Sequence, residues 1–159
     1  MTLAREMALE SEYVMGTFAR KPVEFVEGHG MTLIDDAGNE YLDFLSGIGV
    51  CSLGHCHPSI VQAVSDQAAK LIHVSNYYYI EHRGEVAQLL SNMLNAYVDE
   101  PSPETWKTFF ANSGAEANEA MIKVARKYSF DKYGKGRSTI LTLNRSFHGR
   151  TITLSLIHI

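Results

Sequence analysis

Four residues in one segment have the types and spacing of an anion-binding helix terminus. Ser113, Gly114, Ala115 and Glu116 lie within the stretch FFANSGAEANEAMIKVARKY, residues 109–128. The first N–H groups of a helix have no acceptor within the helix and lie at the positive end of its dipole. Gly114 has no Cβ, so an anion can approach the backbone. The Ser113 hydroxyl and the amides of Gly114 and Ala115 can therefore donate hydrogen bonds to a phosphate.

The same residues are also explained as an ordinary helix cap. Ser113 and Glu116 match the S-x-x-E capping box, a pattern that recurs in many folds. Glu116 and Glu119 precede the basic residues of the segment, the charge order that a helix dipole favours. From spacing alone the cap is the better-supported interpretation. A nucleotide is disfavoured, because SGAEANE lacks both the P-loop lysine and the G-x-G-x-x-G pattern.

A second group of residues with chemical potential is NRSFHGRT, residues 144–151. Phe147 could cover the face of a flat ligand, and Arg150 could hold a carboxylate through two hydrogen bonds. The alternative is a surface loop in which Phe147 packs on the core and Arg150 is solvated. Taken alone, this group favours the surface loop.

Two strands and a helix are expected to position both groups. WKTFF (106–110) and STILTL (138–143) read as strands, and an apolar stripe at helix spacing lies between them. Strand, helix and strand in this order predict a βαβ unit with a parallel sheet, and ligands bind at the carboxyl edge of such sheets. The stripe comprises Ala117, Ala120, Met121, Val124, Ala125 and Tyr128.

The N-terminal half predicts a helix, a small antiparallel unit and two further helices. Residues 4–18 have a helical pattern, and residues 23–47 read as three short strands with turns at 28–30 and 36–39. Helical periodicity returns over 60–72 and 86–97, before prolines break the chain at 101 and 103.

Composition excludes several classes of protein. The chain has 159 residues, 45% of them hydrophobic and 20% charged, with a net charge of −4, so no basic field for nucleic acid is present. No apolar run is long enough to span a membrane, and the N-terminus does not resemble a signal peptide. Two cysteines, Cys51 and Cys56, favour a reducing cytoplasm over a disulfide framework. In GHCHP, residues 54–58, a metal site and a turn are both conceivable, and we interpret it as a turn with no metal.

Four ordered segments resemble the class III pyridoxal-phosphate (PLP) aminotransferases. They are residues 41–64, 70–79, 109–128 and 146–152, and the resemblance covers the chain from about Tyr13 to Ser155. It implies an α/β, aspartate aminotransferase-like fold. Residues 1–45 would contribute a helix and antiparallel strands to the small domain, and residues 46–159 an incomplete large PLP-binding domain.

The resemblance also implies roles for particular residues. Ser113, Gly114 and Ala115 would hold the phosphate of PLP, Phe147 would stack on its ring, and Arg150 would bind the substrate α-carboxylate. His148 receives no chemical role. A full-length homodimer is implied, with the tyrosines at 77–79 either at its interface or packed beneath a loop.

Within the family the resemblance favours N-acetylornithine as amino donor and 2-oxoglutarate as acceptor, as in arginine biosynthesis. Ile48 stands where ornithine aminotransferases usually have tyrosine, and Phe147-His148-Gly149-Arg150 where they have Trp-Gly-Arg. Succinylornithine, ornithine and 4-aminobutyrate are the alternative donors.

No lysine of the chain lies in a segment that resembles the family's Schiff-base site. The sequence therefore predicts an N-terminal fragment without a catalytic residue, inactive alone and marginally stable. A non-catalytic phosphate-binding module and an inert structural fragment are the competing hypotheses. The seven lysines are Lys21, Lys70, Lys107, Lys123, Lys127, Lys132 and Lys135.

Overall fold

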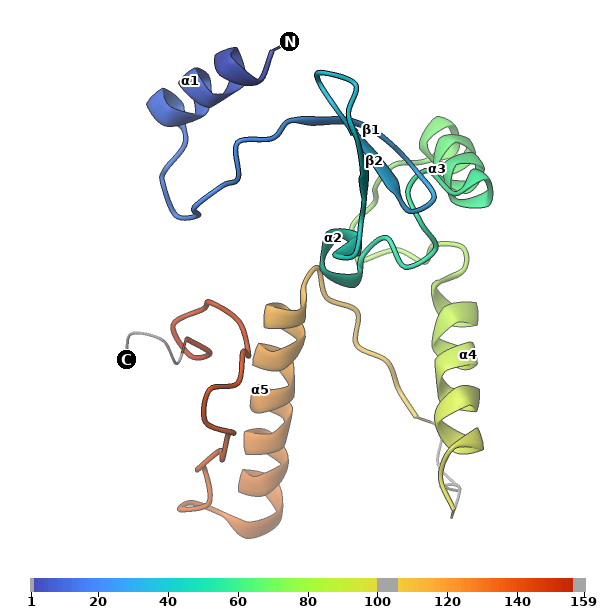
Figure 1. Cartoon of the computed structure of the whole chain (residues 1–159). Coiled ribbons are helices and arrows are strands. Elements are labelled where there is room, and N and C mark those ends of the chain that lie inside the picture. The colour runs from blue at the N-terminus through green and yellow to red at the C-terminus, as the bar shows by residue number, and fades with distance from the viewer. Residues whose placement is uncertain (1, 100–105, 156–159) are drawn as a thin grey trace. The chain divides into compact units, whose positions relative to one another are not determined.

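The computed structural model describes residues 2–99 and 106–155, which form two compact units, Met1–Tyr78 and Tyr79–Ile159 (Figure 1). The predicted domain boundary at residue 45 stays a prediction. The first unit contains helix α1 (Leu3–Tyr13), strands β1 (Phe25–His29), β2 (Thr32–Asp35) and β3 (Glu40–Leu42), and helices α2 (Ser46–Gly49) and α3 (Pro58–Lys70). The second contains helices α4 (Arg83–Ala96) and α5 (Gly114–Tyr133).

The predicted antiparallel unit is confirmed as a three-stranded sheet in the order β1-β2-β3. Its second turn is organised by Asp35, whose carboxylate accepts hydrogen bonds from the amides of Ala37 and Asn39 and from the Tyr41 hydroxyl. The first turn is displaced from its predicted place, because Gly28 and His29 belong to β1. Gly30, at φ +54°, makes the reversal instead.

The predicted N-terminal helix is shorter than its pattern, ending at Tyr13 rather than residue 18. Val14 is already extended, and the residues after it include Gly16 and Thr17, which are poor helix formers. The helices expected from the later periodicity are confirmed as α3 and α4. Pro58 begins α3, a position where the missing N–H of proline costs no helical hydrogen bond.

The parallel sheet is not formed among the described residues. Residues 106–110 and 138–143 were expected to be strands, but neither segment is hydrogen-bonded as one. A strand exists only through its neighbour, and parallel neighbours are joined by long connections, so local sequence does not bring them together. The antiparallel hairpins form because their partners are separated by short turns.

Most apolar side chains of the described residues are at least partly exposed, and Leu154 is the one buried hydrophobic residue among them. The predicted stripe on α5 lies open: Met121 is 60% and Val124 69% exposed. Within residues 2–99 and 106–155, no helix has the length and apolar character needed to cross a membrane.

Candidate functional site

The predicted helix terminus is formed by α5, and its cap is confirmed. The Ser113 hydroxyl accepts a hydrogen bond from the Glu116 amide at 3.2 Å. The Glu116 carboxylate accepts from the amide of Asn112 at 2.7 Å, one residue before the cap rather than at it. The reciprocal arrangement fixes where the helix begins and leaves the hydroxyl hydrogen of Ser113 available to an acceptor.

The first turn of α5 presents free amide donors. The helix supplies no acceptor for the N–H groups of Gly114 and Ala115, and no other described residue accepts from them. An added Cβ at Gly114 would meet no atom within 4 Å, so the space beside this backbone is open. Donors at the positive end of a helix dipole, with open space beside them, can bind a phosphate or carboxylate.

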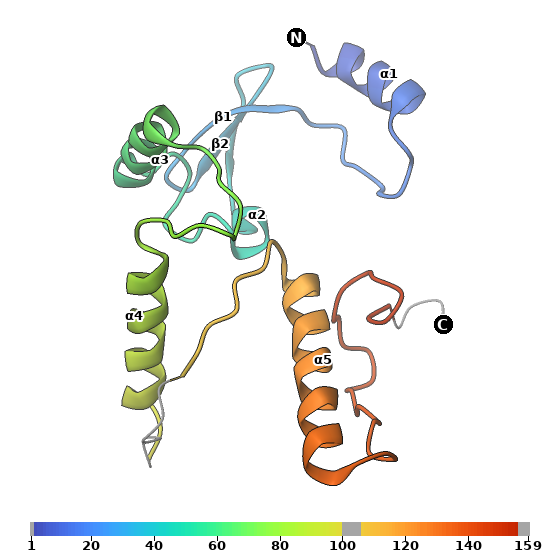
Figure 2. The same cartoon turned by 180° about the vertical axis from the view of Figure 1, so that it is seen from behind.

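The second predicted group lies against this terminus. Residues 145–154 run beside α5 in both views (Figures 1 and 2). Gly149, at φ +133°, packs so closely that a Cβ there would lie 2.8 Å from the Ala115 Cβ and 2.8 Å from the Leu154 Cδ1. Only glycine permits this approach, because real Cβ contacts are longer than 3 Å. The structure therefore brings the two sequence-predicted groups together.

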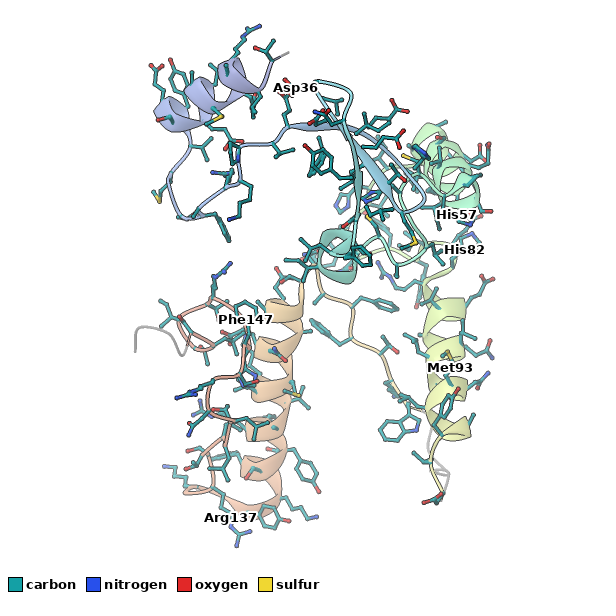
Figure 3. All side chains as sticks on the ribbon, viewed as in Figure 1. Asp36, His57, His82, Met93, Arg137 and Phe147 are labelled. Carbon is teal, nitrogen blue, oxygen red and sulfur yellow. The ribbon has the colours of Figure 1, made fainter. Side chains whose placement is uncertain are left out.

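Phe147 and Arg150 extend from this segment as neighbours. The Arg150 guanidinium carbon lies 5.4 Å from the centroid of the Phe147 ring, within the range of a cation–π contact. The Phe147 side chain is 68% exposed, so its ring is not packed into the core as the surface-loop alternative required. Figure 3 labels Phe147 on the segment beside α5. An exposed ring beside a guanidinium can contact a flat ligand that carries a carboxylate.

Two contacts and one unpartnered atom at this site were not anticipated from the sequence. The Asn118 side-chain amide donates to the carbonyl of His148 at 2.7 Å, and the Thr151 hydroxyl donates to the Glu119 carboxylate at 2.5 Å. The His148 Nε2 is buried and has no hydrogen-bond partner among the described residues. One sequence feature could have indicated the two contacts: Asn118 and Glu119 are polar residues shortly after the helix cap, beside the apolar stripe of the helix.

The GHCHP turn in the first unit has a structural role. The backbones of His55 and Gly30 exchange two hydrogen bonds, and the His55 Nε2 lies 2.6 Å from the Asp43 Oδ2. This hydrogen bond, together with donation from the amides of Ser46 and Leu45, lowers the pKa of the Asp43 carboxyl below its ordinary value. Among the described residues, no group of three or more histidine, cysteine or acidic side chains is arranged to hold a metal ion.

The chain before α3 contains a left-handed turn. Ser46, Gly47, Ile48 and Gly49 all have positive φ, with Ile48 at φ 60° and ψ 46°. This region is costly for a β-branched residue, and such strain concentrates at functional sites. Ile48 is the position that the sequence analysis connected with substrate choice, and its side chain is 86% exposed.

A separate cleft of about 590 Å³ lies beside α4, where Trp106 Nε1 donates to the Asn95 side chain at 2.8 Å. None of the predicted site residues lines it. The predicted site is an exposed surface of the described residues rather than this cleft. The cleft is lined by Gly84, Ala87, Gln88, Ser91, Asn92, Asn95, Trp106, Lys107 and Thr108.

Comparison with known proteins gives consistent matches. The family model described as aminotransferase class III matches residues 17–157. Acetylornithine aminotransferase of Nitrosomonas europaea is 50% identical over 140 residues, covering 88% of this chain and 33% of that protein. The chain therefore spans about a third of the length of the curated relatives it matches.

Two solved structures share the architecture. Ornithine aminotransferase of Toxoplasma gondii superposes with a TM-score of 0.82 at 30% identity, covering 97% of this chain and 35% of that one. Taurine:2-oxoglutarate aminotransferase of Bifidobacterium kashiwanohense, solved in complex with PLP and glutamate, superposes with a TM-score of 0.79 at 29% identity, covering 97% and 32%.

Proposed function

Because the chain belongs to the class III aminotransferases, we propose that it serves the transfer of an amino group from N-acetylornithine to 2-oxoglutarate. The family depends on PLP, and the likeness to solved aminotransferases confirms the predicted α/β fold class. Two curated relatives that match at 50% identity are both named acetylornithine aminotransferase. Those names support acetylornithine as the donor.

The phosphate of PLP is assigned to the start of α5. The unpaired amides of Gly114 and Ala115 and the Ser113 hydroxyl offer three donors to one anion. A doubly charged phosphate fits this donor set, because each of these three groups can donate to it and the helix dipole adds positive potential. Bound PLP supplies an electron sink to the substrate; the chain supplies orientation and charge.

The ring and the carboxylate are assigned to Phe147 and Arg150. The exposed Phe147 ring offers a flat surface for the pyridine ring. The Arg150 guanidinium, 5.4 Å from the centroid of that ring, would bind the α-carboxylate of the amino donor through paired hydrogen bonds. These two residues would bind and orient the cofactor ring and the amino donor. No lysine of this chain is given a role in the chemistry.

The observation that carries the proposal is the contact of Gly149 with Ala115. It joins a phosphate-binding helix terminus to a segment that bears an aromatic ring and a guanidinium. A ligand that has a phosphate, a flat ring and an attached amino acid needs these three surfaces close together. A surface loop or a bare helix cap requires no such contact.

A cytoplasmic location and a homodimer belong to the same proposal. Both cysteines of the chain, Cys51 and Cys56, are free thiols in the structure, as a reducing compartment maintains them. The dimer rests on the family resemblance, and gel filtration with light scattering of the protein as its gene encodes it would test it.

Phosphate-dependent binding of PLP tests the proposed site. Equilibrium dialysis of the purified protein would compare PLP with pyridoxal, which lacks the phosphate. We expect PLP to bind at least about tenfold more tightly, and Gly114→Val to abolish that preference by adding bulk beside the amides. Gly84→Val is the matched control, since Gly84 also lies in the first turn of a helix with no atom within 4 Å of an added Cβ.

Two results would contradict the site. Equal affinity for PLP and pyridoxal would show that the phosphate does not bind at the start of α5. If Gly114→Val and Gly84→Val lowered the affinity for PLP equally, the loss would reflect reduced stability in general. The donor is tested separately, by transamination of 2-oxoglutarate with acetylornithine, succinylornithine, ornithine and 4-aminobutyrate, using the protein as its gene encodes it. Preference for a donor other than acetylornithine would refute that assignment alone.

A further inference from the structure

One face of α5 holds the segment that carries the ring and the guanidinium. Three features join them: Asn118 donates to the carbonyl of His148, Glu119 accepts from the hydroxyl of Thr151, and Ala115 lies so close to Gly149 that a Cβ there would be 2.8 Å from the Ala115 Cβ. The helix residues are spaced i, i+3 and i+4, so they lie on one face of the first two turns. Phosphate donors and segment contacts therefore belong to the same rigid element.

This face is distinct from the apolar stripe of the helix. Ala115, Asn118 and Glu119 are half-buried, whereas Met121 and Val124 are exposed. In this unit, α5 therefore uses polar side chains rather than its apolar stripe to hold residues 148–151. Hydrogen bonds are directional, so they set a position more sharply than non-directional apolar contact does.

The held segment has little regular structure of its own. No helix or strand is formed between Gly134 and Ser155, and the local bonds that exist converge on Thr151. The Thr151 carbonyl accepts from the amides of Leu154 and Ser155, and its hydroxyl also accepts from the amide of Leu154 at 3.3 Å. Because these local hydrogen bonds converge on Thr151, the contact of Thr151 with Glu119 sets the position of the segment on α5.

We propose that Asn118 and Glu119 are positioning residues, which set the distance between the phosphate donors of α5 and the Phe147 ring. This inference rests on the proposed function of that site. Neither residue is assigned a contact with the ligand. Asn118 holds the carbonyl directly after Phe147, and Glu119 holds the residue directly after Arg150, so each fixes one end of the pair. Small displacements of positioned groups lower binding and rate steeply.

The test separates binding of the ring from binding of the phosphate. Asn118→Ala removes the donor to His148 and leaves a better helix former, so α5 is retained. We expect its affinity for PLP to fall about tenfold, the usual effect of one lost hydrogen bond. Its affinity for inorganic phosphate, measured by competition, should stay within about twofold of the unmodified protein. Asn92→Ala, an exposed asparagine within α4, is the matched control.

The Glu119–Thr151 contact offers conservative substitutions. Thr151→Ser keeps the hydroxyl and should keep PLP affinity, whereas Thr151→Val removes it and should weaken PLP binding about tenfold. Adding Glu119→Ala to Thr151→Val should cause little further loss, because both remove the same bond. Hydrogen exchange of the ligand-free protein should quicken at Leu154 and Ser155 in Thr151→Val and Glu119→Ala, with the C-terminal half of α5 unchanged.

Each outcome decides between the proposals. If PLP binds the unmodified protein with a phosphate preference but none of these variants changes its affinity, the positioning role is refuted and the proposed function stands. If the variants lose affinity for inorganic phosphate in parallel with affinity for PLP, Asn118 and Glu119 support the fold generally and do not position the ring. If the unmodified protein shows no phosphate preference, the proposed function itself fails.

Discussion

Replacing Gly149 by alanine is expected to disrupt the site more than any other single methyl addition. The new Cβ would lie 2.8 Å from the Ala115 Cβ and 3.2 Å from its Cα, atoms held by the backbone of α5. Overpacking of this kind costs about 1–3 kcal/mol. The backbone at φ +133° adds about 1–3 kcal/mol for a residue with a side chain. Gly149→Ala should thus lower the free energy of unfolding by roughly 2–6 kcal/mol, or release the segment from the helix.

Trp106 provides the assay. It is the single tryptophan of the chain and lies in the same unit as Gly149, so urea unfolding followed by its fluorescence reports on that unit. PLP affinity is measured in parallel. Gly84→Ala is the control, and it should raise the free energy of unfolding rather than lower it. An added Cβ there meets no atom within 4 Å, and alanine in place of glycine in a helix stabilises by up to about 1 kcal/mol.

A second substitution separates the contact with the Ala115 Cβ from the other costs. Ala115→Gly removes that Cβ, so the double variant should recover this part of the overpacking cost and retain both the contact with the Leu154 Cδ1 and the backbone cost. If Gly149→Ala changes neither the free energy of unfolding by more than about 0.5 kcal/mol nor the affinity for PLP, the close packing of the segment on α5 is wrong. Absence of any recovery in the double variant would show that the Ala115 Cβ does not contribute to the cost.

Three further predictions concern the Ser113 cap, the hydrogen bond between Asp43 and His55, and the strained turn at Ile48. Ser113→Ala should destabilise α5 by about 1 kcal/mol in urea unfolding, and Ser113→Asp should restore most of it; equal stability of all three proteins would refute the cap. The lowered pKa of Asp43 means that its stabilising contribution is full above about pH 4 and is lost as pH falls through the folded-state pKa. Asp43→Asn should therefore be less stable than the unmodified protein at neutral pH and lose less stability on acidification, and parallel pH curves would contradict this. Ile48→Gly should raise the thermal midpoint, because relief of about 1–2 kcal/mol of left-handed strain exceeds the entropic cost of glycine, and a lowered midpoint would show that the exposed side chain is held by other contacts.

Local elements of this protein were predictable because their causes lie within a few residues. The α5 start follows from Ser113 and Glu116, three residues apart, and the start of α3 from Pro58. The second turn of the sheet was placed correctly because Asp35 and Asn39 bond each other across it. Where short-range preferences conflicted, as in the pattern continuing past Tyr13, the helix ended earlier than its periodicity indicated.

The candidate site also has a part that the sequence could indicate and a part that it could not. The residue types at 113–115, 147 and 150 made phosphate, ring and carboxylate binding possible, but alone they favoured a helix cap and a surface loop. The family resemblance implied the binding roles, and these assignments stay proposals. The spacing could not show that the two groups meet, because residues 115 and 149 are far apart in sequence. The parallel strands expected at 106–110 and 138–143 are not formed, for a related reason. Pairing between distant segments is not encoded in either segment alone.

By itself, the sequence determined helices α1, α3, α4 and α5, the antiparallel hairpins, the cap of α5 and the family to which the chain belongs. Tertiary structure alone decided that Gly149 packs on Ala115, that Asn118 and Glu119 hold the following segment, and that His55 pairs with Asp43. Helices and turns depend on backbone geometry and neighbouring side chains, which a short window of residues contains. Contacts across many residues depend on how the chain closes its loops, and that is settled only when the surfaces meet.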